Sequence, residues 1–142
     1  MPRKTDSGNP ADWLWIAESD LTLIRLGAEH KVGHTAVRSK LAEVLEKVLK
    51  AELIRTGWPL EKTHDLRKLA SELQLRKSDL EEQFRPLVVA LAEVYFVDRY
   101  PGFDLDDPDW PALRAQLEQV EALLATVKAR VAIVLPPARS VE

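Results

Sequence analysis

The chain has 142 residues, no cysteine and a formal net charge of −3. Its length fits a single compact domain, since domains commonly contain about 100 to 150 residues. The absence of cysteine excludes disulfide frameworks, thiolate metal sites and cysteine nucleophiles. No apolar signal-peptide core follows the N-terminus, and no apolar stretch reaches the roughly 20 residues that a membrane span needs. We therefore expect a cytoplasmic protein that does not enter a membrane.

The charged residues are unevenly distributed along the chain. Residues 38–77 carry ten Lys or Arg against six acidic residues, whereas residues 78–109 carry two against nine. The mildly acidic total therefore combines a basic second quarter with an acidic third quarter. Such an asymmetry serves either pairing within the fold or contact with a partner, and we favour pairing within the fold.

The first predicted helix spans about residues 10–29. Asn9 can accept a hydrogen bond from the first unpaired amides, and Pro10 suits the first turn of a helix. Apolar residues at helical spacing then form one face: Leu14, Ala17, Leu21, Ile24 and Ala28.

A second predicted helix has a longer apolar stripe, made of Val37, Leu41, Val44, Leu45, Val48, Leu49 and Leu53. It ends at Gly57, which favours the left-handed conformation of a helix terminus, and Pro59 prevents its continuation. The pair Glu46/Lys50 has the favourable acid-before-base order at i,i+4, and we expect it on the outer face of this helix.

Two further helices are predicted in the middle of the chain. Thr63 is expected to cap a short third helix, whose inner face is formed by Leu66, Leu69, Ala70 and Leu73. Ser78 and Glu81 match a capping box for a fourth helix. The apolar spacing extends this helix to Arg99, with a kink near Pro86.

The last predicted helix follows an acidic loop and has Asp109 as its N-cap. Its apolar residues alternate three and four positions apart, as in a coiled-coil seam: Trp110, Leu113, Leu117, Val120, Leu124, Val127 and Val131. Together these elements predict an all-α fold, an antiparallel up-and-down bundle of four long helices plus one short helix. We expect one domain over residues 9–135, with flexible tails at 1–8 and 136–142.

The sequence lacks the motifs of several common active sites. It has no glycine-rich phosphate loop, no dinucleotide-binding glycine pattern, no paired-histidine zincin motif and no serine elbow. His30 and His34 have a spacing found in metal sites, but no third ligand lies nearby in the sequence. The acidic residues Asp104–Asp109 lack the ligand order of a calcium loop, so we interpret them as a solvated entry to the last helix. We predict no metal site and no cofactor.

Two other features combine aromatic and basic residues. Trp58 lies in a Gly-Trp-Pro turn, where we favour a hydrophobic contact at the helix end over base stacking. Arg99 lies at the end of the fourth helix, where it can cap the last carbonyls or contact a phosphate through its guanidinium. The sequence leaves both interpretations of Arg99 open.

Three segments, taken in order, match one family pattern. The first, Asp12–Leu21, contains W-x-x-x-A-x-x-D-L. The second, Glu46–Leu53 followed by Gly57 and Lys62–Leu66, contains E-K-x-L-K-A-x-L, G and K-T-H-D-L, and the third, Arg99–Pro101, is R-Y-P. In this order and at these spacings the segments resemble the HEPN family, which is named for its occurrence in higher eukaryotes and prokaryotes and for nucleotide binding.

The resemblance implies a helical bundle of a kind that often dimerises and is often encoded beside a minimal nucleotidyltransferase. Some members are metal-independent ribonucleases with an R-x4-6-H motif, which in this chain would begin at Arg99. The histidine would then occupy position 104, 105 or 106, where the chain has Asp104, Leu105 and Asp106. The resemblance is therefore to the non-nuclease branch, and we predict no catalytic residue.

From the resemblance we expect a subunit that pairs with itself and with a minimal nucleotidyltransferase, as in toxin–antitoxin pairs. It would present four residues to a nucleotide or RNA phosphate: Arg99, Tyr100, Lys62 and His64. One alternative is a ribonuclease toxin with a rearranged active site that uses His64 and Arg99. Another is a purely structural dimerisation module.

Overall fold

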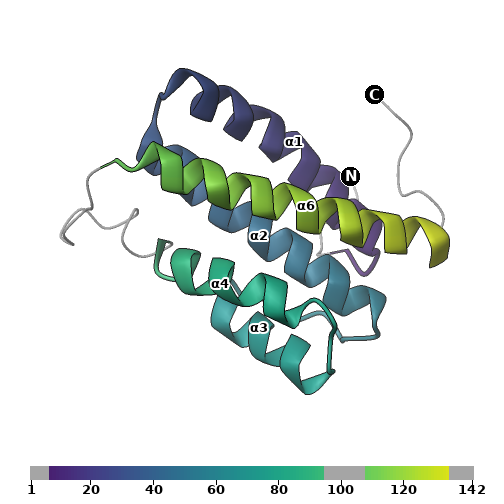
Figure 1. The fold of residues 1–142 in the computed structure, drawn as a ribbon. Helices are drawn as coiled ribbons and strands as arrows, with labels where there is room; N and C mark the ends of the chain where they lie inside the picture. Colours follow the sequence, from purple (N-terminus) through teal and green to yellow (C-terminus); the bar gives the residue numbers. More distant parts are fainter. Residues whose placement is uncertain (1–6, 95–107, 135–142) are drawn as a thin grey trace.

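The computed structural model describes residues 7–94 and 108–134, and the regular secondary structure within these ranges is helical. Five helices follow one another: α1 (Pro10–His30), α2 (His34–Arg55), α3 (Leu66–Leu75), α4 (Glu81–Leu91) and α6 (Trp110–Val134) (Figure 1). The predicted all-α fold is confirmed. None of the helices in the described ranges combines the length and the apolar character that crossing a membrane requires.

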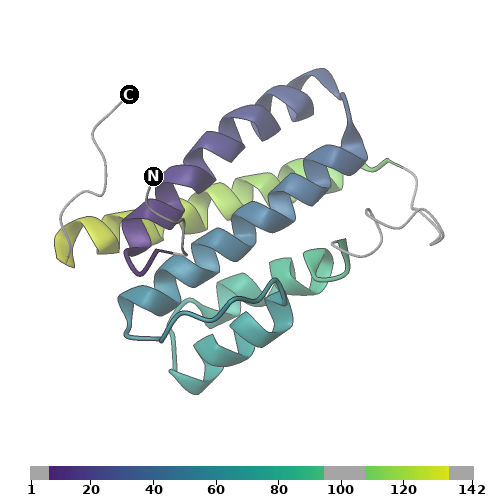
Figure 2. The same ribbon diagram turned by 180° about the vertical axis from the view of Figure 1, so that it is seen from behind.

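Helix α2 lies at the centre of the bundle and packs against α1, α3, α4 and α6. Chain direction alternates through α1, α2, α4 and α6, as Figures 1 and 2 show from opposite sides. Arg114, near the start of α6, donates a hydrogen bond to the carbonyl of Ala28, near the end of α1. Arg130, near the end of α6, contacts Glu52, near the end of α2. Helix α6 therefore runs antiparallel to α1 and in the same direction as α2.

The apolar stripes predicted from the sequence form one core. All five stripe residues of α1 are buried, and so are the seam residues of α6 from Leu113 to Val131. Trp110, at the start of the seam, is partly buried against the same core. The periodicity of the sequence therefore identifies the inward faces of both helices correctly.

Two predicted helix ends are confirmed in detail. The side chain of Asn9 accepts a hydrogen bond from the amide of Ala11 at 3.0 Å. At the end of α2, Gly57 has a φ of +99°, a conformation that a residue with a Cβ rarely adopts. The amide of Trp58 donates to the carbonyl of Leu53 at 3.0 Å, which closes a Schellman motif. Trp58 is buried in the core, so its predicted hydrophobic contact is also confirmed.

The two predicted caps of the short helices are wrong in detail. Helix α3 is capped by Asp65, whose carboxylate accepts from the amides of the first turn, while the Thr63 hydroxyl accepts from the Asp65 amide. Asp65 lies next to the helix and can reach two amides, so it displaces Thr63. The Ser78 hydroxyl accepts from the amide of Leu80, and Glu81 pairs with Arg85 instead of reaching back to close a capping box.

The fourth predicted helix is shorter than expected. Helix α4 contains Pro86 and ends at Leu91, where a turn at Ala92 and Glu93 interrupts it before the helical residue Val94. The expected continuation to Arg99 lies outside the described residues. The apolar periodicity continues across Ala92 and Glu93, so it does not reveal the interruption.

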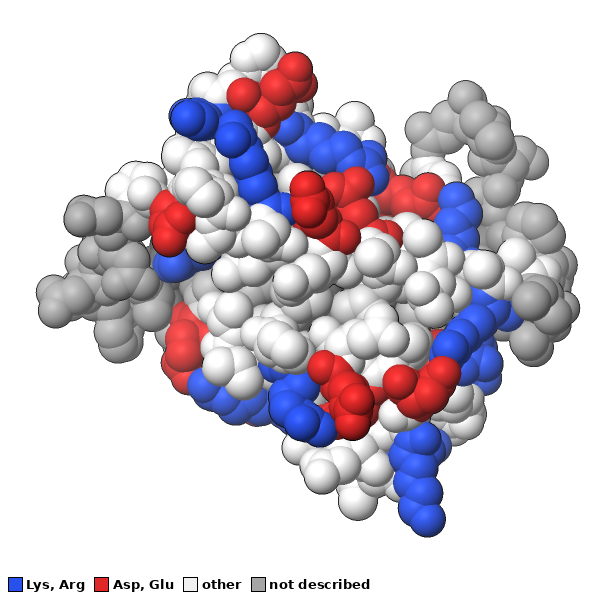
Figure 3. All heavy atoms as spheres, viewed as in Figure 1, with Lys and Arg blue, Asp and Glu red and all other residues white. Residues whose placement is uncertain are grey.

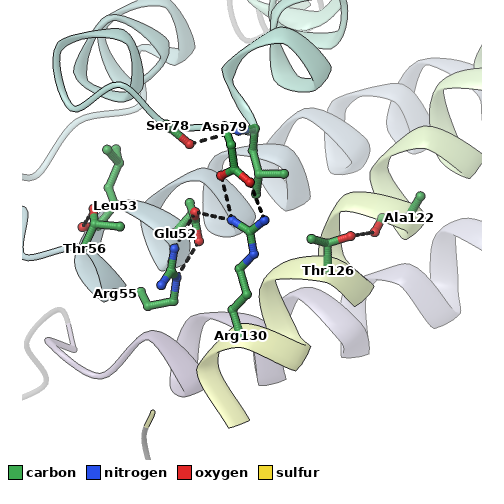
Figure 4. Close-up of polar contacts among 10 residues, drawn as sticks. Glu52, Leu53, Arg55, Thr56, Ser78, Asp79, Ala122, Thr126 and Arg130 are labelled. Atoms are coloured by element: carbon green, nitrogen blue, oxygen red, sulfur yellow. Dashed lines mark hydrogen bonds and ion pairs between the residues drawn. The ribbon is translucent and has the colours of Figure 1, made fainter. Parts of the chain in front are cut away.

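Glu52 on α2 is 1% exposed and lies within a group of charged residues (Figure 4). Its carboxylate accepts hydrogen bonds from Arg55 Nε at 2.7 Å and from Arg130 Nη1 at 3.2 Å. Arg130 also donates to both carboxylate oxygens of Asp79, at 2.9 and 2.7 Å. These hydrogen bonds hold the pKa of the Asp79 carboxyl below its usual range and raise the pKa of Arg130. The group ties α2 and α6 to the segment that precedes α4.

Charges that are far apart in the sequence meet on the surface. Arg67, from the basic second quarter, pairs with Glu93 from the acidic third quarter. Lys128 Nζ lies 3.0 Å from Glu18 Oε2, so α6 is also joined to α1 by an ion pair. Figure 3 shows basic and acidic side chains interspersed on the face seen in Figure 1. Part of the charge asymmetry of the sequence thus serves pairing within the fold.

The close approach of α1 to α2 depends on Gly27. A Cβ at this position would lie 2.6 Å from Val37 Cγ2 and 3.3 Å from the carbonyl oxygen of Val32. We expect Gly27→Ala to lower the free energy of unfolding by about 1–3 kcal/mol through overpacking, although Ala is favoured over Gly within helices by about 1 kcal/mol. Urea denaturation measures the change. The double variant Gly27→Ala/Val37→Ala should lose less stability than the sum of the two single variants, and strict additivity would contradict the proposed clash.

Candidate functional site

Two oppositely charged side chains of α2, Glu46 and Lys50, lie inside the fold. Glu46 is 9% exposed and Lys50 is 2% exposed. Lys50 Nζ donates to Glu46 Oε2 at 2.9 Å and lies 4.9 Å from the centroid of a Trp13 ring on α1. The expectation that this pair occupies an outer face is wrong, because α2 is surrounded by four helices and the segment 56–65.

His64 reaches the Glu46 carboxylate from the connection between α2 and α3. After the reversal at Gly57, this connection runs back along α2 (Figure 2). His64 Nδ1 lies 3.0 Å from Glu46 Oε1 and 3.2 Å from Oε2, while 66% of the His64 side chain is exposed. A hydrogen on Nδ1 donates to the carboxylate, and this bond orients the imidazole. The result is an accessible histidine held by a buried acid.

A small pocket of about 20 Å³ adjoins this histidine. It is lined by residues of three helices and the connection before α3: Ser39, Ala42, Glu43, Glu46, His64, Leu66, Leu91 and Ala92. A volume of this size holds roughly one water molecule. A ligand larger than a few atoms would therefore lie across the mouth of the pocket and send only one polar group into it.

Lys62 is the second predicted site residue within the described ranges. It is exposed, two residues before His64, and we find no ion pair for it there. Other cations nearby are engaged with acids: Arg67 pairs with Glu93, and Lys68 Nζ lies 2.9 Å from Glu61 Oε2. Of these three side chains, Lys62 is the one without an ion pair among the described residues.

The other two predicted site residues, Arg99 and Tyr100, lie outside the described residues. Within the described residues, His64 and Lys62 lie on the same connection, the one between α2 and α3. Leu91, which lines the pocket, belongs to the last turn of α4 before the chain continues toward Arg99. A common site for all four residues remains a prediction.

The histidines considered as metal ligands have other positions. His30 ends α1 and His34 begins α2. His34 Nε2 accepts a hydrogen bond from the amide of Asp109 at 3.1 Å, and its ring meets Trp110 edge-on at 4.9 Å. Asp109 caps α6 as predicted, with the amide of Ala112 at 3.0 Å from its carboxylate. Within residues 7–94 and 108–134 no group of three potential metal ligands occurs.

The role of Glu46 as the acid that orients His64 was not predicted from the sequence. The sequence nevertheless contains a signal for this role. Glu46 and Lys50 lie among apolar residues, including Ala42 and Ala51, that extend around more of the helix surface than a single stripe. A helix that is apolar on most sides is enclosed, so charged residues within it have to be paired.

Removing Lys50 tests how strongly this pair supports the fold. We expect Lys50→Ala to lower the free energy of unfolding by about 3 kcal/mol, because it leaves the buried Glu46 carboxylate without its ammonium partner. Urea denaturation measures the loss.

Lys68→Ala is the matched control, because Lys68 also pairs with an acid but at the exposed surface, and it should leave stability almost unchanged. The double variant Glu46→Gln/Lys50→Met should be more stable than Lys50→Ala, since it removes both charges together. Equal losses for Lys50→Ala and Lys68→Ala would show that burial of the pair has no energetic consequence.

Comparison with known protein families matches residues 10–134 of this chain to the HEPN domain. No curated protein and no solved structure gives a significant match. The matched range contains all five helices described above, the Glu46–His64 pair and Lys62. It also agrees with the resemblance that the ordered motifs indicated. The chain belongs to the HEPN domain family.

Proposed function

We propose that this protein is a nucleotide- or RNA-associated binding subunit. It holds a phosphate group at the surface around His64 and Lys62, which we call the His64 edge of the bundle. Membership of the HEPN family supports an RNA-associated or toxin-type helical protein. The observation that carries the proposal is His64 itself, which is two-thirds exposed and oriented by the buried Glu46 carboxylate. Lys62 adds a second cation two residues away, and Arg99 with Tyr100 completes the proposed set.

The chemistry of the set suits a phosphate. Lysine and arginine donate hydrogen bonds to phosphate oxygens, and a protonated His64 would do so through Nε2, since Nδ1 faces the Glu46 carboxylate. Glu46 alone would repel an anion, but Lys50 Nζ at 2.9 Å and the His64 ring already engage its carboxylate. Phosphate oxygens would therefore contact the exposed cations, while the acid stays behind the histidine.

Calorimetry with AMP, ATP and single-stranded RNA tests this binding. We expect His64→Ala and Lys62→Ala each to weaken binding by about tenfold, because each removes a charge-assisted hydrogen bond. For RNA, Lys62→Ala should also reduce the salt dependence of binding by about one counterion.

The matched control is again Lys68→Ala, whose ammonium is already paired with Glu61, and it should bind almost as the unaltered protein does. Arg99→Ala tests the remaining part of the set. If none of these ligands produces heat and no variant changes the result, the phosphate-binding proposal is wrong.

A second candidate is cleavage of RNA, which the Glu46–His64 pair specifically favours. A carboxylate that holds Nδ1–H of a histidine prepares Nε2 to accept a proton, the arrangement used by general bases in many hydrolases. In this case the histidine would take the proton of a ribose 2′-hydroxyl, whose oxygen attacks the adjacent phosphorus and displaces the 5′-oxygen, which takes up a proton from water. This corresponds to the alternative of a ribonuclease with a rearranged site that uses His64 and Arg99, because none of positions 104, 105 and 106 holds a histidine.

Incubation with bulk RNA separates the two candidates. For a non-catalytic subunit we expect RNA to stay intact on denaturing gels under all conditions that permit binding. Cleavage that disappears in His64→Ala and falls in Glu46→Gln would establish the ribonuclease instead. Cleavage that persists in His64→Ala would assign the activity to a contaminant or to another site.

We also propose that the subunit forms a homodimer, works in the cytoplasm and pairs with a minimal nucleotidyltransferase in a toxin–antitoxin arrangement. The support is the resemblance of the ordered motifs to the family members that have such partners. Light scattering of the purified protein gives its oligomeric state. A neighbouring gene without the G-S-x-x-x-x-x-S-D-x-D motif of such transferases would count against the partner.

A further inference from the structure

A second hollow lies where α1 turns into α2, on a different face of α2 from the His64 pocket. It has a volume of about 520 Å³ and lies between the last turns of α1 and the first turns of α2. Its floor is apolar and includes Ile24 and Val37, which are 1% and 8% exposed. Gly27 lets the two helices approach closely there. We call this feature the α1–α2 groove.

Apolar side chains on the walls of the groove are exposed to solvent. Leu23, Leu26 and Val32 are 60%, 53% and 62% exposed, and all three line the groove. In the described ranges, three other large apolar residues are exposed, namely Ile16, Leu75 and Val89, and none of them lines it. Half of the exposed large apolar side chains thus gather around one hollow. Clustering of this kind marks an interaction surface, whereas single exposed apolar residues do not.

The side chains that line the groove include a lysine and a histidine but no acid. The titratable side chains that line it are His30 and Lys40, and no carboxylate lines it. Lys40 is 41% exposed, and its nearest acids, Asp20 and Glu43, stand at 3.9 Å, at the outer limit of an ion pair. An exposed pair at this distance is weak, so the ammonium remains available to a stronger partner. Charge complementarity therefore calls for an acidic occupant.

The open shape of the groove favours a helix over a small molecule. Sites for small ligands enclose most of the ligand surface, but the walls of this groove are more than half exposed. A helix needs cover on one side only, since its other side can remain in water or pack on its own protein. Residues at i, i+3, i+4 and i+7 of such a helix would fill the apolar floor.

We propose that the α1–α2 groove binds an amphipathic helix of a partner protein whose apolar stripe is flanked by carboxylates. The apolar stripe covers Leu23, Leu26 and Val32, and the carboxylates pair with Lys40 and, when it is protonated, with His30. This binding surface is separate from the phosphate site and does not depend on the proposed function.

Fluorescence anisotropy with two designed peptides tests the proposal. Both are amphipathic helices of about 14 residues, four turns, with the same leucine stripe, and they differ in having Glu or Lys at the flanking positions. We expect the Glu-flanked peptide to bind more tightly. Leu26→Asp should weaken its binding by about tenfold or more, because a charge then enters the apolar contact. Lys40→Glu should reverse the preference between the two peptides.

Val89→Asp is the matched control, since Val89 is 71% exposed on α4 and lies outside the groove. It should bind both peptides as the unaltered protein does. Failure of the Glu-flanked peptide to bind, equal binding of both peptides, or binding that survives Leu26→Asp would each overturn the proposal. A dimer that light scattering finds converted to monomer by Leu26→Asp but not by Val89→Asp would overturn it too, because a second copy of the chain would then occupy the groove.

Discussion

The structure depends on the burial of α2. This helix touches all four of the other described helices, yet Glu46, Lys50 and Glu52 are among its buried residues. An unpaired charge in such a place costs several kcal/mol, so each of the three has to meet a partner of opposite charge. Glu46 and Lys50 pair with each other, while Glu52 recruits Arg130 from α6. Pairing the charges of one helix thereby fixes how the surrounding segments lie against it.

The two buried acids of α2 differ in what their partners leave accessible. Glu52 is held by two guanidinium groups, and the second of them, Arg130, is balanced by Asp79, whose side chain is 69% exposed. Glu46 has one buried partner, Lys50, and one exposed partner, His64. A charge network that ends in an exposed imidazole can exchange protons or contact an anion, whereas a network that ends in an exposed carboxylate repels anions. This difference identifies the His64 edge, rather than the Arg130 group, as the candidate site.

Periodicity and capping rules were sufficient to predict the all-α fold, the inward faces of α1 and α6 and the end of α2 at Gly57. They work there because burial repeats with the helical period and because a positive φ selects glycine. They failed for Glu46/Lys50 because acid-before-base spacing occurs both on exposed and on enclosed helices, and the sequence does not show how many neighbours a helix has. The Glu46–His64 contact joins residues 18 positions apart through a connection without periodicity, so no local pattern predicts it.

The His64 pocket and the α1–α2 groove share the first half of α2 without sharing its residues. Ala36, Val37 and Lys40 line the groove, whereas Ser39 and Glu43 line the pocket. Within the described residues, the two surfaces are linked by the ion pair of Lys40 with Glu43, at 3.9 Å and with both side chains more than a third exposed. Solvent screens a pair of this kind, so a charge placed at Lys40 is felt only weakly at Glu46. Because this exposed contact is weak, the two surfaces can act independently.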